Sequence, residues 1–220
     1  MSGYPTTGLA AHLSADDWAA LVATGITVHF QRGQRLFDQG DPGRHVYVIL
    51  DGAVKVVQLE PDGGQAILTV RTVGDVVGDM AALDGRPRSA TVTALSSLLG
   101  RMLTAEQFRR YVDRPGVAAG FTRYLVARIR EADERGTELA LLPVRVRLAR
   151  CLLRLAVVPP YDPTVRLVSL PQAAIAQLVG ASRNAVVAEL AALRAARVIA
   201  TRRGAVLIED SAALRRCAAG

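Results

Sequence analysis

Residues 171–193 read PQAAIAQLVGASRNAVVAELAAL, and this stretch decides the fold of the C-terminal third of the chain. Apolar residues recur at helical spacing on both sides of a Gly180-Ala181 turn. They are Ile175, Leu178 and Val179 before the turn, and Val186, Leu190 and Leu193 after it. Two short amphipathic helices joined by a glycine-containing turn form a helix-turn-helix.

The start of the second helix carries side chains that suit base reading. Ser182 can cap the helix and offer its first amides to phosphate, Arg183 can pair with guanine O6 and N7, and Asn184 can pair with adenine. An ordinary helical hairpin with solvated polar residues is the alternative, and this pattern alone leaves the two interpretations nearly even. The predicted DNA-reading set is Gln172, Ser182, Arg183, Asn184, Val187, Ala188, Arg202 and Arg203.

The distribution of charge favours DNA. Residues 144–220 carry 12 basic and 4 acidic residues, a net charge of +8, whereas residues 1–143 carry 15 basic and 16 acidic residues. A basic module at one end of a chain indicates a polyanionic partner. A hairpin around Arg202, Arg203 and Gly204 lies where the wing of a winged helix contacts phosphates. A predicted helix at 144–157, a proline-rich turn PPYDP at 159–163 and a strand VRLVSL at 165–170 precede the two short helices and this hairpin. We therefore predict a winged helix that binds double-stranded DNA.

Several other classes of protein are disfavoured. No apolar run approaches the roughly 18 residues of a spanning helix, and the first residues lack the basic region and apolar run of a secretory signal, so we expect a soluble, cytoplasmic protein without a membrane partner. Cys151 and Cys217 lie outside any Cys-x-x-Cys pattern, so we expect no disulfide and no metal site. We find no paired nucleophile and histidine and no phosphate loop of the Walker type, and expect no enzyme.

The rest of the chain predicts three further parts. Ser14 followed three residues later by Asp17 predicts a short capped helix at 14–25, which ends at Gly25. Short β-rich runs separated by glycine turns from residue 26 to about 103 indicate a small antiparallel β-roll. One long helix follows, with an apolar stripe at Phe121, Leu125, Ile129 and Ala132 that Arg128 interrupts. Such a helix can pack on its own roll and pair with a second copy. The predicted architecture is α+β, with an effector domain at 1–115, a dimerisation helix at 116–142 and a winged helix-turn-helix at 143–220.

A second informative stretch, GDVVGDMAALDGRPRSATVTA, spans residues 74–94. Gly78 opens one helical turn whose free amides can hold an anion, and Arg88 and Ser89 follow ten residues later. This combination suits a single phosphate, with the Asp79 carboxylate placed for a sugar hydroxyl. A glycine turn beside a surface arginine is the simpler alternative.

These residues resemble the phosphate-binding cassette of the cyclic-AMP receptor protein and FNR family of bacterial transcription regulators. The similarity continues through RGQRLFDQGDPGRHVYVILDGAVKVV at 32–57, ELALLPVRVRLARCLLRLA at 138–156 and LVGASRNAV at 178–186. The resemblance implies a homodimer that binds DNA and RNA polymerase and takes a small effector in its roll, with cyclic AMP the first candidate. We expect no covalent cofactor. The implied effector residues are Gly78, Asp79, Met80, Arg88, Ser89, Ala90, Ala132 and Asp133.

The sequence also departs from the family pattern. Asp79 replaces a ribose-binding glutamate, and Ala132 and Asp133 replace a Thr-Ser pair that meets adenine. Ala188 stands where some relatives carry a second base-reading arginine, and Pro171 replaces a threonine cap. Two alternatives therefore stay open: a regulator that uses cyclic GMP, a cyclic dinucleotide or no effector, and a nucleotide-sensing module that controls a protein partner.

Overall fold

The computed structural model describes residues 4–60, 63–157, 166–202 and 204–220. The chain divides into two compact units, Met1–Glu131 and Ala132–Gly220. The division falls inside one helix, α4 (Pro115–Leu141), which begins and ends one residue earlier than the sequence predicts. Pro143 follows closely and disfavours helical backbone at the residue before it, which explains where α4 stops.

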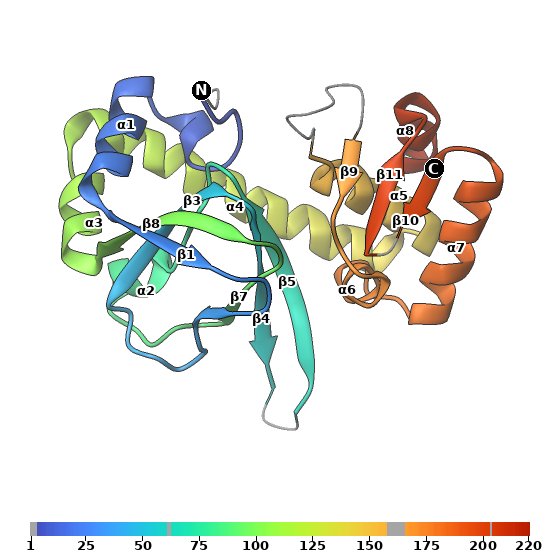
Figure 1. Ribbon diagram of the computed structural model, residues 1–220, viewed down its shortest axis with the longest axis horizontal. Coiled ribbons are helices and arrows are strands. Elements are labelled where there is room, and N and C mark those ends of the chain that lie inside the picture. The colour runs from blue at the N-terminus through green and yellow to red at the C-terminus, as the bar shows by residue number, and fades with distance from the viewer. Residues whose placement is uncertain (1–3, 61–62, 158–165, 203) are drawn as a thin grey trace. The chain divides into compact units, whose positions relative to one another are not determined.

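The N-terminal unit contains two four-stranded antiparallel sheets (Figure 1). One has the strand order β1-β8-β3-β6 and the other β2-β7-β4-β5. The strands are β1 (Ile26–Phe30), β2 (Arg35–Phe37), β3 (His45–Asp51), β4 (Ala53–Leu59), β5 (Gln65–Thr72), β6 (Val76–Val77), β7 (Thr91–Ala94) and β8 (Leu98–Thr104). This arrangement is the expected β-roll.

Strand β3 explains how the roll is layered. Successive side chains of a strand point to opposite faces, and here both faces are buried. Tyr47 and Ile49 pack with side chains from the second sheet, whereas Val46 and Val48 pack beneath the helices. The roll therefore has one core between its sheets and another between a sheet and the helices.

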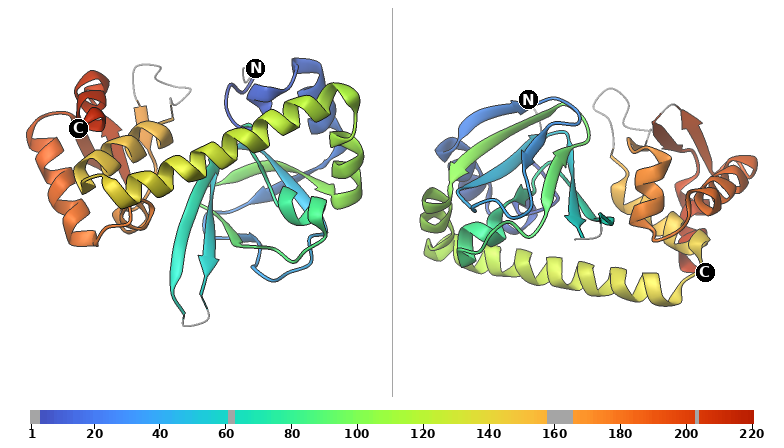
Figure 2. Two further views of the ribbon diagram at one scale, coloured as in Figure 1. Left: turned by 180° about the vertical axis from the view of Figure 1, so that it is seen from behind. Right: turned by 90° about the horizontal axis from the view of Figure 1, so that it is seen from below.

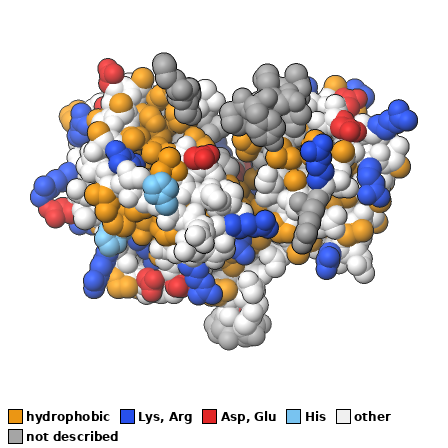
Figure 3. Space-filling view, in the orientation of Figure 1, with side chains coloured by type: hydrophobic (Ala, Val, Ile, Leu, Met, Phe, Trp, Pro, Cys, Tyr) orange, Lys and Arg blue, Asp and Glu red, His pale blue; other side chains and the backbone are white. Residues whose placement is uncertain are grey.

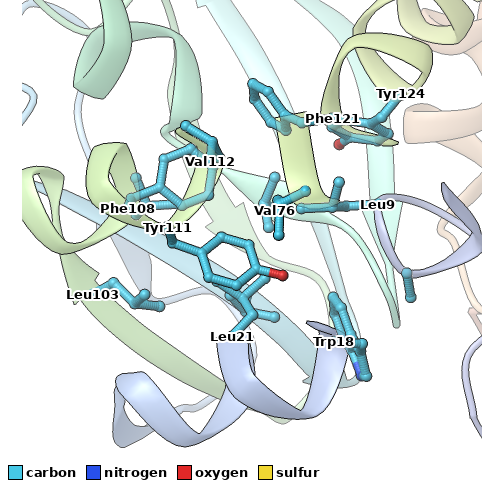
Figure 4. Close-up of a cluster of buried hydrophobic side chains, with 14 of the residues drawn as sticks. Leu9, Trp18, Leu21, Val76, Leu103, Phe108, Tyr111, Val112, Phe121 and Tyr124 are labelled. Atoms are coloured by element: carbon cyan, nitrogen blue, oxygen red, sulfur yellow. The ribbon is translucent and has the colours of Figure 1, made fainter. Parts of the chain in front are cut away.

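The helical core gathers α1 (Ala15–Thr24), α3 (Ala105–Val112) and the first half of α4 against this sheet (Figures 2 and 4). The Ser14 side chain caps α1 by accepting from the amide of Asp17, as the sequence predicts. Helix α3 is not predicted, although Thr104 and Gln107 form a capping box at its start. Phe108 of α3 packs edge-on against Phe121 of α4, with ring centroids 5.7 Å apart.

The C-terminal unit is a winged helix-turn-helix. Its helices are α5 (Val144–Leu155), α6 (Gln172–Leu178), α7 (Arg183–Ala195) and α8 (Ser211–Ala219), and its strands are β9 (Arg166–Val168), β10 (Ile199–Arg202) and β11 (Ala205–Ile208). The strands form one antiparallel sheet in the order β10-β11-β9. The sequence predicts all of these except α8, which packs on α5. The predicted PPYDP turn at 159–163 lies outside the described residues.

Candidate functional sites

The cassette in the N-terminal unit begins at Gly78, which precedes the short helix α2 (Asp79–Asp84). Gly78 adopts a left-handed backbone with φ of +85°. A Cβ at this position would lie 2.5 Å from Nη1 of Arg88 and 3.0 Å from the carbonyl oxygen of His45. Glycine is therefore required on two grounds: the backbone conformation and the close approach of the arginine.

Arg88 is the central cation of the cassette, and only 4% of it is exposed. Its guanidinium donates to the carbonyl oxygens of Gly78, at 2.7 Å, and His45, at 2.5 Å. It also lies 4.1 Å from the centroid of the Phe37 ring. Among the described residues no carboxylate lies within ion-pair distance of Arg88, and its Nε has no hydrogen-bond partner. Burial lowers the pKa of Arg88 below its ordinary value.

Asp79 is also buried, but it has a cationic partner. Nη1 of Arg128 on α4 lies 2.5 Å from Oδ2 of Asp79, which is 2% exposed. The Arg128 guanidinium also lies 5.4 Å from the centroid of the Tyr124 ring. Burial by itself lowers the pKa of Arg128, but the nearby Asp79, Tyr124 and Asp75 together raise it above the ordinary value.

From the sequence alone, Arg128 is expected only to interrupt an apolar stripe and has no predicted functional role. The structure shows why a charge stands there: this position on α4 faces the roll and neutralises Asp79. The sequence feature that could have revealed this ion pair is the charged residue inside the apolar stripe, because a buried charge needs a partner.

A second ion pair links α4 to strand β5. Nη1 of Arg71 lies 2.9 Å from Oε2 of Glu131. Asp75, in the same region, is 6% exposed and accepts from the amide of Thr72. The Tyr124 hydroxyl lies 3.4 Å from the other Asp75 oxygen. Burial raises the pKa of Asp75, with the charge of Arg71 opposing the shift.

The remaining predicted effector residues are distributed as follows. Ser89 is exposed beside the buried Arg88 and Ala90, and Met80 is 52% exposed on α2. Ala132 and Asp133 are exposed and belong to the C-terminal unit. Their contact with an effector remains a prediction, whereas Gly78, Asp79 and Arg88 lie together in one unit.

The predicted dimer stripe needs one correction. Phe121 is 6% exposed because it packs in the core of its own chain, and Leu125 is partly buried against the same core. Phe121 is therefore unavailable to a second helix. Ile129 is 61% exposed, and Val126, which lies outside the predicted stripe, is 44% exposed. The interruption at Arg128 reflects two faces of one helix, one turned to the roll and one to solvent.

The helix-turn-helix presents the predicted DNA-reading residues on its surface. Ser182 caps α7 by accepting from the amide of Ala185, at 3.2 Å. At the start of α6, Gln172 is half-buried, and Arg202 is exposed at the end of β10. Arg203 lies outside the described residues. The exposed side chains of α7 include Arg183, Asn184, Val187 and Ala188.

Gly180 fixes the turn between α6 and α7. Its φ is +58°, and a Cβ added there would lie 2.6 Å from a methyl carbon of Leu139. Arg147 of α5 reaches the carbonyl oxygens of both Leu139 and Gly180, at 3.4 and 3.5 Å. The last part of α4 therefore supports the turn directly in front of α7.

A reactive thiol, a metal site and a membrane span are three further features to consider. Cys151 is buried, and burial raises its thiol pKa to about 11, so the thiolate is scarce near neutral pH. In the part of the chain that the structure describes, no His, Cys, Asp and Glu side chains gather into a metal-binding group. Across the same residues, no helix is both long and apolar enough to cross a bilayer.

Each unit of the chain matches the model of a known protein family. Residues 27–114 match the model of the cyclic nucleotide-binding domain, and residues 146–217 match that of the Crp-like helix-turn-helix domain. A CRP-like cAMP-activated global transcriptional regulator of Mycobacterium tuberculosis is 33% identical over 202 residues, covering 90% of each chain. The cyclic AMP receptor protein of Thermus thermophilus is 30% identical over 192 residues, covering 87% of each.

Solved structures show the same fold. A transcriptional regulator of the CRP family from Thermus thermophilus, TTHB099, has a TM-score of 0.72 at 27% identity, covering 88% of this chain and 97% of its own. A c-di-GMP responsive regulator of Xanthomonas campestris, CLP, has a TM-score of 0.71 at 21% identity, covering 89% and 99%.

A roll of the cyclic nucleotide-binding type followed by a winged helix defines a class of DNA-binding transcription regulators. The chain belongs to this class and specifically to the Crp/Fnr family, as its identity with the Mycobacterium tuberculosis regulator over nine-tenths of both chains shows. This family consists of DNA-binding regulators and not of enzymes.

Proposed function

We propose that the protein is a homodimeric transcription regulator whose affinity for its operator is set by an anionic nucleotide bound in the roll, with cyclic AMP as the first candidate. The buried guanidinium of Arg88 carries this proposal. Its hydrogen bonds go to two neutral carbonyl groups, and among the described residues it has no counter-ion. A buried charge without a partner is costly, and a bound phosphate supplies the missing negative charge.

The Asp79–Arg128 pair supports the proposal that the site binds the sugar of a nucleotide as well as its phosphate. Asp79 has the carboxylate expected to meet a ribose hydroxyl, and Arg128 holds it beside the cassette. An effector that bonds to Asp79 changes the surroundings of Arg128, and Arg128 belongs to α4. A ligand that interacts differently with two positions of α4 shifts the equilibrium between them. We propose this as the link between effector and helix.

Membership of the Crp/Fnr family also supports a proposal about the dimer and its partners. We propose that two copies pair along α4 through the exposed Val126 and Ile129, bind double-stranded DNA with α7, and contact RNA polymerase in the cytoplasm. Two-fold symmetric binding places the half-sites about 34 Å apart, in successive major grooves. Sedimentation of the wild-type protein and of the Ile129→Glu variant tests the pairing. A charge in the contact between the two α4 helices should separate the dimer into monomers.

Calorimetric titration with cyclic AMP, then cyclic GMP, at one stated salt concentration tests the effector. We expect saturable binding of cyclic AMP on the order of −8 kcal/mol, a micromolar dissociation constant. Arg88→Met should lose this binding while the unliganded protein stays folded, because an apolar side chain replaces an uncompensated charge. Arg86→Met, an exposed arginine two residues away, is the matched control.

Each alternative has its own outcome in these titrations. Binding of cyclic GMP alone would keep the site and change the ligand. Heat from neither nucleotide, repeated at a second temperature, together with effector-independent DNA binding, would overturn the proposed control by a cyclic nucleotide. Failure of Arg183→Ala to weaken DNA binding would instead favour a module that controls a protein partner.

A further inference from the structure

The outward face of α7 combines two polar residues with two apolar ones. Val186, Leu190 and Leu193 are buried on the inner face, at 0%, 2% and 1% exposure. Helical spacing of three and four residues places Val187 on the same face as Arg183 and Asn184. Val187 is 40% exposed, and it is the bulky aliphatic side chain exposed on this helix among the described residues.

A single exposed valine on a protein surface is common and needs no explanation. The location of Val187 distinguishes it. It stands one helical turn after the two side chains that suit base edges, and Ala188 beside it is also exposed. The two residues form a small apolar surface where a DNA-reading helix meets the bases.

The charge of the unit selects the partner for this surface. Residues 144–220 have a net charge of +8, and arginine side chains are spread over the C-terminal unit in Figure 3. Arg183 and Asn184 make no side-chain hydrogen bond or ion pair with the described residues. An apolar protein groove would leave both of these polar groups buried without partners, whereas the major groove of DNA offers acceptors and donors to each.

Thymine alone among the four bases presents a methyl group, at C5, in the major groove, and aliphatic side chains contact it. Guanine and adenine satisfy Arg183 and Asn184 through hydrogen bonds, but neither offers Val187 an apolar partner. We propose that Val187 reads a thymine in each half-site through its C5 methyl group, with the short side chain of Ala188 leaving room for the base. This inference rests on the proposed DNA-binding function and names the base class that the apolar part of α7 selects.

Removal of a single methyl group from DNA tests this directly. An operator is first selected from random double-stranded DNA by the full-length protein, with cyclic AMP and again without it. Each thymine of one half-site is then replaced in turn by deoxyuridine, which keeps every hydrogen-bonding group and lacks the methyl. Fluorescence anisotropy at fixed salt gives the dissociation constants.

We expect one thymine per half-site at which deoxyuridine weakens binding about fourfold, the value of one buried methyl-sized group. Val187→Ala should weaken binding to the thymine operator and lose most of the difference between thymine and deoxyuridine at that position. Val157→Ala is the matched control, since Val157 is an exposed valine of the same unit outside α7. It should keep the full difference.

Three results overturn the inference. If the selected half-site contains no thymine, or if wild type and Val187→Ala respond alike to every deoxyuridine, Val187 reads no methyl group while the DNA function stands. If selection enriches no sequence, and Arg183→Ala binds DNA as wild type does, the proposed function fails together with the inference.

Discussion

The two candidate sites satisfy their polar and charged side chains in opposite ways. In the roll, Asp79 and Arg88 are 2% and 4% exposed, and each bonds to groups of the same chain. On α7, Arg183 and Asn184 are exposed and make no side-chain bond to the described residues. The effector site is therefore assembled by the tertiary fold, and its residues contribute to the stability of the roll. The face of α7 is a local helical surface whose polar side chains are free to bind DNA.

The largest expected effect is on DNA binding. Arg183→Ala should cost about 1 to 3 kcal/mol per half-site, because one bidentate contact to guanine is lost. The free energy of unfolding should change by less than about 0.5 kcal/mol, as for other exposed positions. Anisotropy with the selected operator and a urea titration measure the two quantities.

Arg215→Ala is the matched control for charge, since Arg215 is exposed on α8. It should reduce DNA affinity only by the weaker, sequence-independent effect of net charge. If Arg183→Ala lowered stability as well, the recognition face would have a structural role and the contrast between the sites would fail.

The second effect is on the stability of the roll. Asp79→Ala should cost about 3 kcal/mol, because it leaves the largely buried Arg128 without its carboxylate. The chain has one tryptophan, Trp18, which is buried in the helical core of this unit. Its fluorescence during urea unfolding therefore reports on the N-terminal unit. Asp113→Ala, at an exposed aspartate of the same unit, should stay close to wild type.

A double-mutant cycle sharpens this prediction. Asp79→Leu with Arg128→Leu should recover much of the lost stability, since well-packed apolar residues can replace a buried pair at little cost. Recovery would show that the ion pair is not required for the stability of the roll. An additive loss would instead show that both groups stabilise the fold independently.

A smaller effect of opposite sign is expected at Asp75. Burial raises the pKa of this carboxyl in the folded protein, so its contribution to stability is present at pH below the unfolded pKa and is lost as the pH rises through the folded pKa. Asp75→Asn should therefore stabilise the roll near neutral pH, and the gain should shrink as the pH falls through the folded pKa. Trp18 fluorescence in urea at several pH values measures it, and a gain independent of pH would contradict the assignment.

The smallest effect is expected at the half-exposed link between β5 and α4. Glu131→Gln should cost about 0.5 to 1 kcal/mol, because the Glu131 side chain is 33% exposed and its pairing with Arg71 is screened. The loss should decrease in high salt. A cost as large as that of Asp79→Ala would mean that the two ion pairs act as one network.

Much of the architecture follows from local sequence. The glycine-separated β runs, the capped helix after Ser14, and the two helices around Gly180 are all present with nearly the predicted bounds. Apolar spacing and turn residues act over a few positions, so sequence alone determines them. Helices α3 and α8 are missed because their apolar patterns are short and depend on the partners they pack against.

The candidate sites likewise contain some features that local sequence predicts and others that it does not. Spacing within a few residues encodes a helix face and a tight turn, so the sequence alone predicts which residues would read DNA and which glycine and arginine would form the cassette. The pairing of Arg128 with Asp79 and the place of Phe121 in the core of its own chain are visible only in the folded structure. These contacts join residues far apart in the sequence, and a helix with two occupied faces has one periodicity, which does not tell which face meets the roll.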